Sequence, residues 1–370
     1  MSSNNPDRQL NLFVPLVSDG SLRDQRDTME RPFFSLSKNK RLKPIEYQNP
    51  RDGVFVTVRP HPDYGMATIW DADILIWAAS VICEMQKRKI NDLPRTLHFQ
   101  PYDLLRSIRR GTSGAQYQRL REALWRLRST DIRTNIRAPR GKKEANFGWI
   151  SEWTDLVDDQ GNSKGMSLTL SEWFFEGIVR EGGILSIDPR YFDITGGRER
   201  WLYRVARKHA GGNGAEGFAI SLPVLFEKSG AEGTYRRFKF EILKVAKANA
   251  LPGYHLAIEA AASGEEPLLR MTRREMLGDD APPAPPRTPR ASRAKPAPMG
   301  QAALPLRSAI LPEAMIQKIR QDFPGWDVYA LQAQFDAWIE DRDERQPDNY
   351  PSAFYGFVKQ YHARHRHQLR

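Results

Sequence analysis

The sequence lacks disulfide pairs, long hydrophobic runs and a leader pattern. Its one cysteine, Cys83, has no partner within the chain, which fits a reducing compartment. No run of about eighteen apolar residues occurs, so we expect no transmembrane helix. The longest apolar segment, residues 69–85, is interrupted by Asp71 and Asp73 and predicts a buried core helix. Residues 1–5 lack the pattern of a signal peptide. We therefore expect a cytoplasmic protein that makes no membrane contact.

The sequence also lacks the motifs of enzymes that act on nucleotides or nucleic acids. No glycine-rich loop ending in Gly-Lys-Ser/Thr is present, which argues against a P-loop ATPase. A rolling-circle nicking enzyme would need two histidines around an apolar residue to hold a metal, together with a nucleophilic tyrosine. The one His-x-His, formed by His365 and His367, encloses an arginine in a basic tail, and the other histidines share no ligand spacing with Cys83. We therefore expect a non-enzyme with no cofactor and no metal.

What the chain does have is an excess of basic residues. It contains 56 Lys and Arg against 45 Asp and Glu, which gives a net charge of +11 at pH 7 and a pI of about 9.7. Residues 100 to 145 contain twelve basic residues and four acidic ones. Such a surplus favours a polyanion such as DNA as the partner.

The same basic stretch predicts a helix-turn-helix with a β-hairpin attached, which is the order of elements in a winged helix. The elements are a helix at 102–110, a turn at 111–114, a helix at 115–129, and a hairpin with strands at 131–137 and near 146–153. Ser113 or Thr112 can cap the second helix. We expect the hairpin to act as the wing, with Arg140, Lys142 and Lys143 at its tip in contact with phosphates or a minor groove.

The helix at 115–129 separates apolar from polar side chains. At about 100° per residue, one face collects the apolar residues Leu120, Ala123, Leu124 and Leu127. The opposite face carries Gln118, Arg119, Glu122 and Arg126, with Arg121 at its edge. In a major groove, arginine can bind guanine and glutamine can bind adenine, each through two hydrogen bonds. We therefore predict that Gln118, Arg119, Arg121 and Arg126 contact DNA, although a solvated amphipathic helix would show the same pattern.

A second copy of the pattern begins 116 residues later. Ser113-Gly114-Ala115 is echoed by Ser229-Gly230-Ala231, and Tyr117-Gln118-Arg119-Leu120 by Tyr235-Arg236-Arg237-Phe238. The elements around the echo are a helix at 221–228, a helix that ends near 249, and a hairpin with strands at 254–258 and 268–271. The buried stripe is predicted to be Phe238, Ile242 and Val245, and the DNA contacts to be Arg236, Arg237, Lys244 and Lys247. Two winged helices in tandem would read two successive major-groove segments.

The composition divides the chain into five parts of an α+β protein. They are a flexible arm at 1–30, a first winged-helix domain at 31–180, a second at 181–277, a linker at 278–308 and a small helical unit at 309–370. The linker is rich in proline and arginine, cannot form a core, and is expected to be an extended, disordered tether. The small unit is expected to have helices near 312–321, 326–340 and 351–365.

Several segments resemble the plasmid replication initiator protein A family of proteobacteria. The similarity covers roughly residues 30 to 275, and the segments that carry it are 113–124, 132–136, 168–171, 186–192, 199–204 and 206–208. The resemblance implies an initiator that binds repeated double-stranded sites in a plasmid origin and recruits host replication proteins, without covalent DNA chemistry of its own. It does not extend to the linker or to the C-terminal unit.

The sequence leaves alternatives open. A winged-helix transcription regulator that represses its own promoter would carry the same motifs, and a nicking enzyme is a more remote third. Tandem copies favour the initiator, because many regulators carry one winged helix per chain and dimerise; a homodimer is also open for this chain. The C-terminal unit mixes acidic and basic residues, which fits either a third DNA contact or a docking module for a host helicase, its loader or a host initiator.

Overall fold

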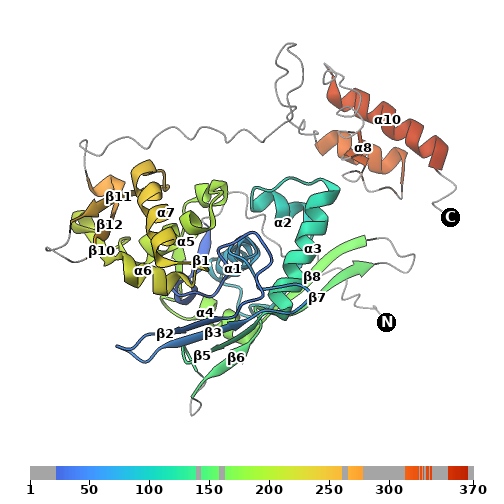
Figure 1. Cartoon of the computed structure of the whole chain (residues 1–370). Coiled ribbons are helices and arrows are strands. Elements are labelled where there is room, and N and C mark those ends of the chain that lie inside the picture. The colour runs from blue at the N-terminus through green and yellow to red at the C-terminus, as the bar shows by residue number, and fades with distance from the viewer. Residues whose placement is uncertain are drawn as a thin grey trace. The chain divides into compact units, whose positions relative to one another are not determined.

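The computed structural model describes residues 22–138, 143–157, 163–260 and 266–277, and in the C-terminal part residues 313–324, 326, 328, 331, 332, 334, 335 and 349–365. The chain divides into two compact units, residues 1–288 and 289–370, and each has a hydrophobic core of its own. The described part of the larger unit combines helices with four antiparallel sheets (Figure 1). The prediction of a mixed α and β protein is therefore confirmed.

Six elements between residues 72 and 170 form what we call the first repeat. They are α1 (Ala72–Lys87), β4 (Thr96–Phe99), α2 (Pro101–Ser107), α3 (Gly114–Ser129), β7 (Ile150–Val157) and β8 (Ser163–Leu170). In the sheet, β8 lies between β4 and β7. Helix α1 is apolar on nearly every side and is buried along most of its length, as the sequence predicts for a core helix. Helix α2 starts with Pro101, whose missing N–H costs nothing in a first turn.

The second repeat has the same order of elements. They are α5 (Gly197–His209), β10 (Phe218–Ser221), α6 (Leu222–Ser229), α7 (Tyr235–Ala248), β11 (Tyr254–Glu259) and β12 (Leu268–Arg273). The last strand, β12, again lies between the other two. Helix α7 begins after Thr234, whose hydroxyl accepts a hydrogen bond from the N–H of Arg237, and ends at Asn249 in a left-handed conformation.

The hairpin that the sequence predicts as the wing of the first repeat belongs to a different sheet. Strands β5 (Asp131–Thr134) and β6 (Ala145–Phe147) extend a four-stranded sheet in the order β2-β3-β5-β6. Its other strands are β2 (Ile45–Gln48) and β3 (Phe55–Arg59), and β5 pairs with β3. The hairpin that pairs with β4 in the first repeat is β7–β8. The prediction for the wing was therefore wrong in its position along the chain.

Trp149 explains why the chain leaves one sheet for the other. The predicted return strand at 146–153 is split, and Trp149 lies fully buried at the break between β6 and β7. Its ring stacks on Phe34, with the centroids 4.5 Å apart. Gly148 precedes it, and a Cβ there would lie 3.0 Å from the carbonyl oxygen of Arg128. The buried indole and this close backbone approach separate β6 from β7.

The N-terminal segment is part of the fold from residue 22 onward. Strand β1 (Arg23–Gln25) pairs with β9 (Ile184–Ser186), and α4 (Glu172–Val179) packs on β1. Asp24 is buried and accepts hydrogen bonds from Nε and Nη2 of Arg204 on α5, at 2.7 and 3.0 Å. The predicted flexible arm at 1–30 is therefore wrong for residues 22–30, while residues 1–21 lie outside the described part of the chain.

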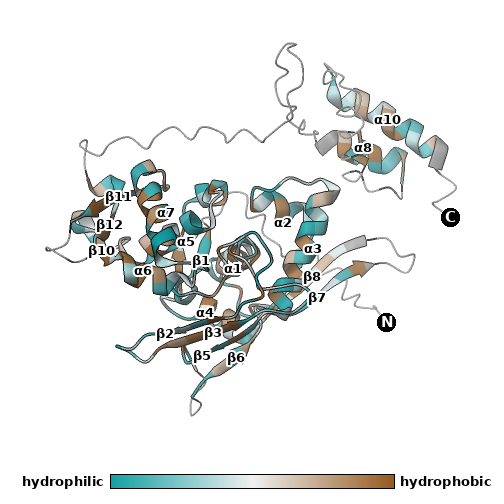
Figure 2. Ribbon diagram, in the orientation of Figure 1, coloured by the Kyte–Doolittle hydropathy of each residue, from teal (hydrophilic) through white to brown (hydrophobic). Residues whose placement is uncertain are grey.

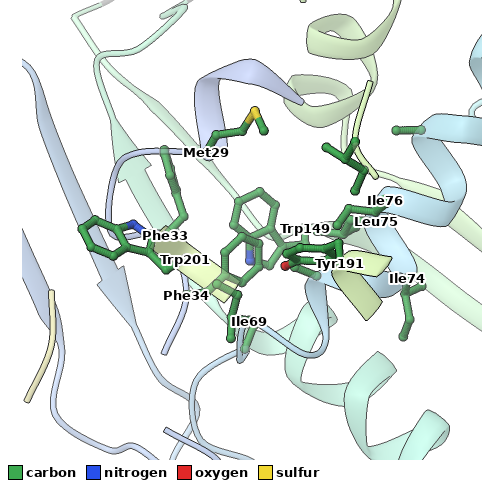
Figure 3. Close-up of a cluster of buried hydrophobic side chains, with 14 of the residues drawn as sticks. Met29, Phe33, Phe34, Ile69, Ile74, Leu75, Ile76, Trp149, Tyr191 and Trp201 are labelled. Carbon is green, nitrogen blue, oxygen red and sulfur yellow. The ribbon is translucent and has the colours of Figure 1, made fainter. Parts of the chain in front are cut away.

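One hydrophobic cluster runs through both repeats. It combines Met29, Phe33 and Phe34 of the N-terminal segment, residues of α1, Trp149, and Tyr191 and Trp201 from the second half of the chain (Figure 3). The expected domains at 31–180 and 181–277 thus share a core within one compact unit, and the boundary near residue 180 does not separate two cores. Helices α3 and α7 show both colours in Figure 2, as amphipathic helices at the edge of a core should.

Buried ion pairs also join the repeats. Asp73 of α1 binds Arg110 of the first repeat at 3.0 Å and Arg200 of α5 at 2.6 Å. Burial opposes the charge of Arg200, but Asp73 outweighs it and raises the pKa of Arg200 above its ordinary value. Arg200 also donates to the carbonyl oxygens of Phe192 and Ile194. The carboxylate of Asp73 therefore connects α1, the first helix of the first repeat, with α5, the first helix of the second repeat.

The C-terminal unit has a small helical core. Its described helices are α8 (Glu313–Asp322) and α10 (Tyr350–His365), close to the predicted 312–321 and 351–365. The buried side chains are Ile316, Ile319, Val328, Leu331, Phe335, Tyr350, Phe354 and Val358. The predicted linker at 278–308 lies outside the described residues. In the part of the chain that is described, no helix has both the length and the apolar character to cross a membrane.

Glu30 should make the stability of the larger unit depend on acid pH. Its carboxylate binds Lys208 at 2.8 Å, His209 at 2.6 Å and Lys228 at 2.7 Å. Burial alone would raise the pKa of Glu30, but these three partners hold it far below its ordinary value. A lowered folded-state pKa gives stability that is present above the unfolded pKa of about 4.3 and is lost as the pH falls below it. We expect the difference in unfolding free energy between the wild type and Glu30→Gln to shrink by about 1.5 kcal/mol from about pH 6 to about pH 3.

Urea unfolding at each pH measures this difference. Glu46→Gln, on the exposed side of β2, is the control, and its difference from the wild type should stay nearly constant. A difference for Glu30→Gln that does not change with pH would contradict the assignment.

Candidate nucleic-acid interface

Helix α3 exposes the side-chain amide of Gln118 and some of its basic side chains to solvent. Leu120, Ala123, Leu124 and Leu127 are buried, as predicted. Gln118, Arg119 and Glu122 are exposed, and Gln118 donates to Glu122 at 3.3 Å. No acidic partner of Arg119 occurs among the residues that the structure describes. The helix begins after Ser113, whose side chain makes no capping hydrogen bond. Both Gln118 and Arg119 are therefore accessible to a ligand that approaches this helix, although Gln118 would have to exchange its hydrogen bond to Glu122.

Two other predicted DNA contacts on α3 have partners inside the protein. Arg121 is exposed and binds Asp155 of β7 at 3.2 Å. Arg126 is largely buried and donates from Nε and Nη2 to the two carboxylate oxygens of the buried Asp71, at 2.7 and 2.8 Å. Burial opposes the charge of Arg126, but Asp71 raises its pKa above the ordinary value. The prediction that Arg126 contacts DNA is therefore corrected: this side chain ties α3 to the start of α1.

An aromatic cluster that the sequence analysis missed covers the C-terminal half of α3. Trp125 lies parallel to Tyr64, with ring centroids 5.2 Å apart, and edge-on to Trp153 of β7 at 5.4 Å. The ring of His61 also packs against Tyr64, with the centroids 5.0 Å apart. Trp125 lies three residues after Glu122 on the outward face, so its exposed position could have been predicted from the sequence. Its partner Tyr64 could not, because it is distant in sequence. The exposed Gln118 and Arg119 lie in the N-terminal half of α3, which is the part of a recognition helix that contacts bases in helix-turn-helix proteins, while Arg128 is exposed near its C-terminal end.

Helix α7 presents a longer basic surface. Arg236, Arg237, Lys244 and Lys247 are all exposed, as predicted. Arg237 binds Glu241 of the same helix at 3.1 Å, and Glu241 also pairs with Arg198 of α5. The buried side is formed by Phe238, Ile242 and Ala246, whereas the predicted Val245 is only partly buried. Phe240 lies between the basic residues and is exposed, which the sequence analysis did not note.

The two helices match when they are offset by 118 residues. Their inward positions then correspond, since Leu120, Leu124 and Leu127 align with Phe238, Ile242 and Val245. The outward positions correspond as well: Gln118 with Arg236, Arg119 with Arg237, and Glu122 with Phe240. Both helices therefore expose an arginine at the same position, Arg119 in α3 and Arg237 in α7. The residue at the centre of the outward face differs: it is Glu122 in α3 and Phe240 in α7.

The structure describes one of the three predicted wing residues. Lys143 is exposed just before β6, whereas Arg140 and Lys142 lie outside the described residues. In the sequence all three fall between β5 and β6, which are strands of the four-stranded sheet and not of the hairpin of the first repeat. The tips of the two repeat hairpins, residues 158–162 and 261–265, also lie outside the described residues.

Other features offer little chemistry. Cys83 is buried, and burial raises the pKa of its thiol to about 11. A depression of about 370 Å³ on the four-stranded sheet is lined by Glu46, Tyr47, Gln48, Phe55, Thr57 and Arg133. Arg133 there already binds Glu144 at 2.7 Å. Within the described ranges, no three His, Cys, Asp or Glu side chains are grouped so that they could hold a metal ion.

Comparisons with known proteins agree on one family. The model of a family described as Replication initiator protein A matches residues 23–256, which include both α3 and α7. A protein of Wigglesworthia glossinidia brevipalpis that is named for a role in replication is 33% identical over 244 residues, which cover 65% of this chain and 86% of that protein.

Two solved structures align more distantly. A crystal structure of domain 2 and domain 3 of RctB aligns with a TM-score of 0.47 and 14% identity, over 70% of this chain and 99% of that chain. Another structure of RctB domains 2 and 3 gives a TM-score of 0.43 at 14% identity, over 65% of this chain and 94% of that chain. At these scores the likeness carries no argument about the fold.

Arg126 and Arg119 should behave differently when each is changed to alanine. Arg126→Ala leaves the buried Asp71 carboxylate without its cation, so we expect the unfolding free energy to fall by about 3 kcal/mol. Arg119→Ala removes an exposed side chain and should change it by less than about 0.5 kcal/mol. Urea unfolding followed by tryptophan fluorescence measures both. Equal stabilities of the two variants would show that the Asp71 ion pair is not structural.

Proposed function

Because the chain belongs to the replication initiator protein A family, we propose that it initiates plasmid replication by binding specific, repeated double-stranded sites at an origin. The single observation that carries this proposal is the pair of matched helices, α3 and α7, that expose polar and basic side chains within one compact unit. The matched family segment, residues 23–256, spans both helices.

We infer that each repeat is a winged helix. Each has a helix, a strand, two helices and a two-stranded hairpin, and the last strand of the hairpin pairs with the first strand of the repeat. This order places the third helix, α3 or α7, beside the hairpin, where a winged helix carries its recognition helix. The wings would be β7–β8 and β11–β12.

The exposed side chains suit the major groove. Arg119, Arg236 and Arg237 can each bind guanine through two hydrogen bonds, and Gln118 can bind adenine in the same way. Lys244 and Lys247 carry charge along α7 where phosphates would flank the groove. The net charge of +11 supports approach to a polyanion at any sequence.

We propose further that the protein acts without covalent DNA chemistry. The one thiol, Cys83, is buried with a raised pKa, so it is a poor nucleophile. Within this proposal the chain binds the origin and helps to open it, and host proteins carry out further unwinding and synthesis. The C-terminal unit is our candidate for contact with a host helicase, its loader or a host initiator, because it has its own core and lies outside the matched family segment.

A transcription regulator would use the same two helices. The presence of two recognition helices in one chain favours the initiator, since many regulators carry one per chain and dimerise. The two roles are compatible, because a protein that binds repeated sites beside its own gene can also repress the promoter there.

Arg119→Ala should lower affinity for a cognate duplex at least tenfold and affinity for random duplexes much less. One bidentate contact to a base is worth about 1–3 kcal/mol of discrimination. Fluorescence anisotropy with a cognate and a scrambled duplex at fixed salt measures both affinities.

The charge-matched control is Arg51→Ala, which removes an exposed arginine from the turn between β2 and β3. This variant should bind both duplexes nearly as the wild type does. If Arg119→Ala loses the same factor on the cognate and the scrambled duplex, Arg119 contributes only charge and does not read bases.

Deletion of residues 300–370 should leave site-specific affinity within about threefold of the wild type and abolish plasmid maintenance. The described core of the C-terminal unit is separate from that of the larger unit, so its loss should not unfold the helices that contact DNA. Full-length Phe354→Ala, which removes a fully buried ring from that core, should reproduce the maintenance defect. A fall in site affinity of more than tenfold would assign the C-terminal unit to the DNA interface instead.

A further inference from the structure

Phe240 is exposed where a soluble helix would ordinarily carry a polar residue. Its side chain is 69% exposed, the largest fraction among the exposed large hydrophobic side chains of the described residues. It lies in the middle of α7, whose inward face is already filled by Phe238, Ile242 and Ala246. The ring therefore contributes little to the core, and an apolar surface of this size is more stable when something covers it.

The position of Phe240 on the helix indicates what covers it. At about 100° per residue, Phe240 lies within about 40° of Arg236, Lys244 and Lys247, and about 60° from Arg237. The ring is thus at the centre of the exposed basic stripe of α7, with cations before and after it along the helix. An apolar protein partner would have to bury these charges, whereas a polyanion pairs with them.

The major groove of DNA offers an apolar feature between two rows of phosphates. This is the C5 methyl group of thymine, which projects into the groove and is contacted by apolar side chains, phenylalanine among them. We propose that Phe240 packs against a thymine methyl group and sets a preference for thymine in the segment that α7 reads. The inference rests on the proposed binding of duplex DNA and adds a specificity-determining residue to it.

The matched position in α3 strengthens the inference. Glu122 occupies there the place that Phe240 has in α7, and it too is exposed. A carboxylate accepts a hydrogen bond from the amino group of cytosine and has no affinity for a methyl group. With a carboxylate in one helix and a phenyl ring in the other, the two segments of each site differ in sequence, and thymine is required only in the one that α7 contacts.

The first test is a selection from a random-sequence duplex library with three proteins in parallel: wild type, Phe240→Ala and Phe240→Leu. The wild-type consensus should contain a fixed thymine that Phe240→Ala no longer selects and that Phe240→Leu retains in part. Every other position should be common to the three. Met276→Ala removes another exposed apolar side chain, after β12 and off α7, and should select the wild-type consensus.

The second test removes only the methyl group. Each thymine of the selected duplex is replaced in turn by deoxyuridine, and affinity is measured by anisotropy. Wild type should lose about fourfold at the thymine that α7 reads, the value for one buried methyl group, and Phe240→Ala should lose almost nothing there. Because Phe240 is exposed, all variants should keep the melting temperature of the wild type.

The outcomes are distinguishable. If the wild type selects no consensus at all, the proposed function fails and the inference fails with it. If the wild type selects a site but no deoxyuridine weakens it more than it weakens Phe240→Ala, duplex binding stands and the thymine contact is overturned. If Phe240→Ala keeps the full consensus and affinity but loses plasmid maintenance, the ring contacts a protein, and the inference is likewise overturned.

Discussion

One buried carboxylate, Asp73, links the two repeats within the hydrophobic cluster that they share. It binds Arg110 from the first repeat and Arg200 from the second, and it is almost inaccessible to water. Loss of both arginines would leave a buried charge without a cation, which costs about 3–5 kcal/mol, so the two arginines together restrain the arrangement. Asp24 with Arg204, and Glu30 with Lys208 and Lys228, add contacts of the same kind between the N-terminal segment and the second repeat. The relative placement of α3 and α7 depends on these pairs.

The same buried pairs decide which cations are left for a ligand. A chain with a net charge of +11 has more arginines than its fold requires. The structure divides them into arginines that pair with buried aspartates and arginines that stay exposed. Arg126, Arg200 and Arg204 are directed inward against aspartates. Arg119 and Arg237 stay exposed at matched positions of α3 and α7, and in the proposed function they read bases. A helix that lies against a core can thus carry structural and ligand-binding arginines only a few residues apart.

Local periodicity predicted the helices but not the long-range pairings. The buried stripe of α3 and the exposed basic face of α7 follow from 3.6 residues per turn, and both were predicted from the sequence. The pairing of β5 with β3, the ion pair of Arg126 with Asp71 and the burial of residues 22–30 depend on partners 55 to 180 residues away, which no local pattern contains. Phe240 was detectable, because an apolar residue four positions after Arg236 falls on the basic face.

The central claim is that α3 and α7 read two segments of one duplex at a spacing that the buried ion pairs fix. Insertion of half a helical turn, about 5 base pairs, between the two protected segments of a selected site tests it most directly. A rigid unit cannot follow the second segment to the other side of the duplex, so affinity should fall to that of one repeat, and hydroxyl-radical footprinting should show a single protected segment. Two protected segments at undiminished affinity after the insertion would contradict the account.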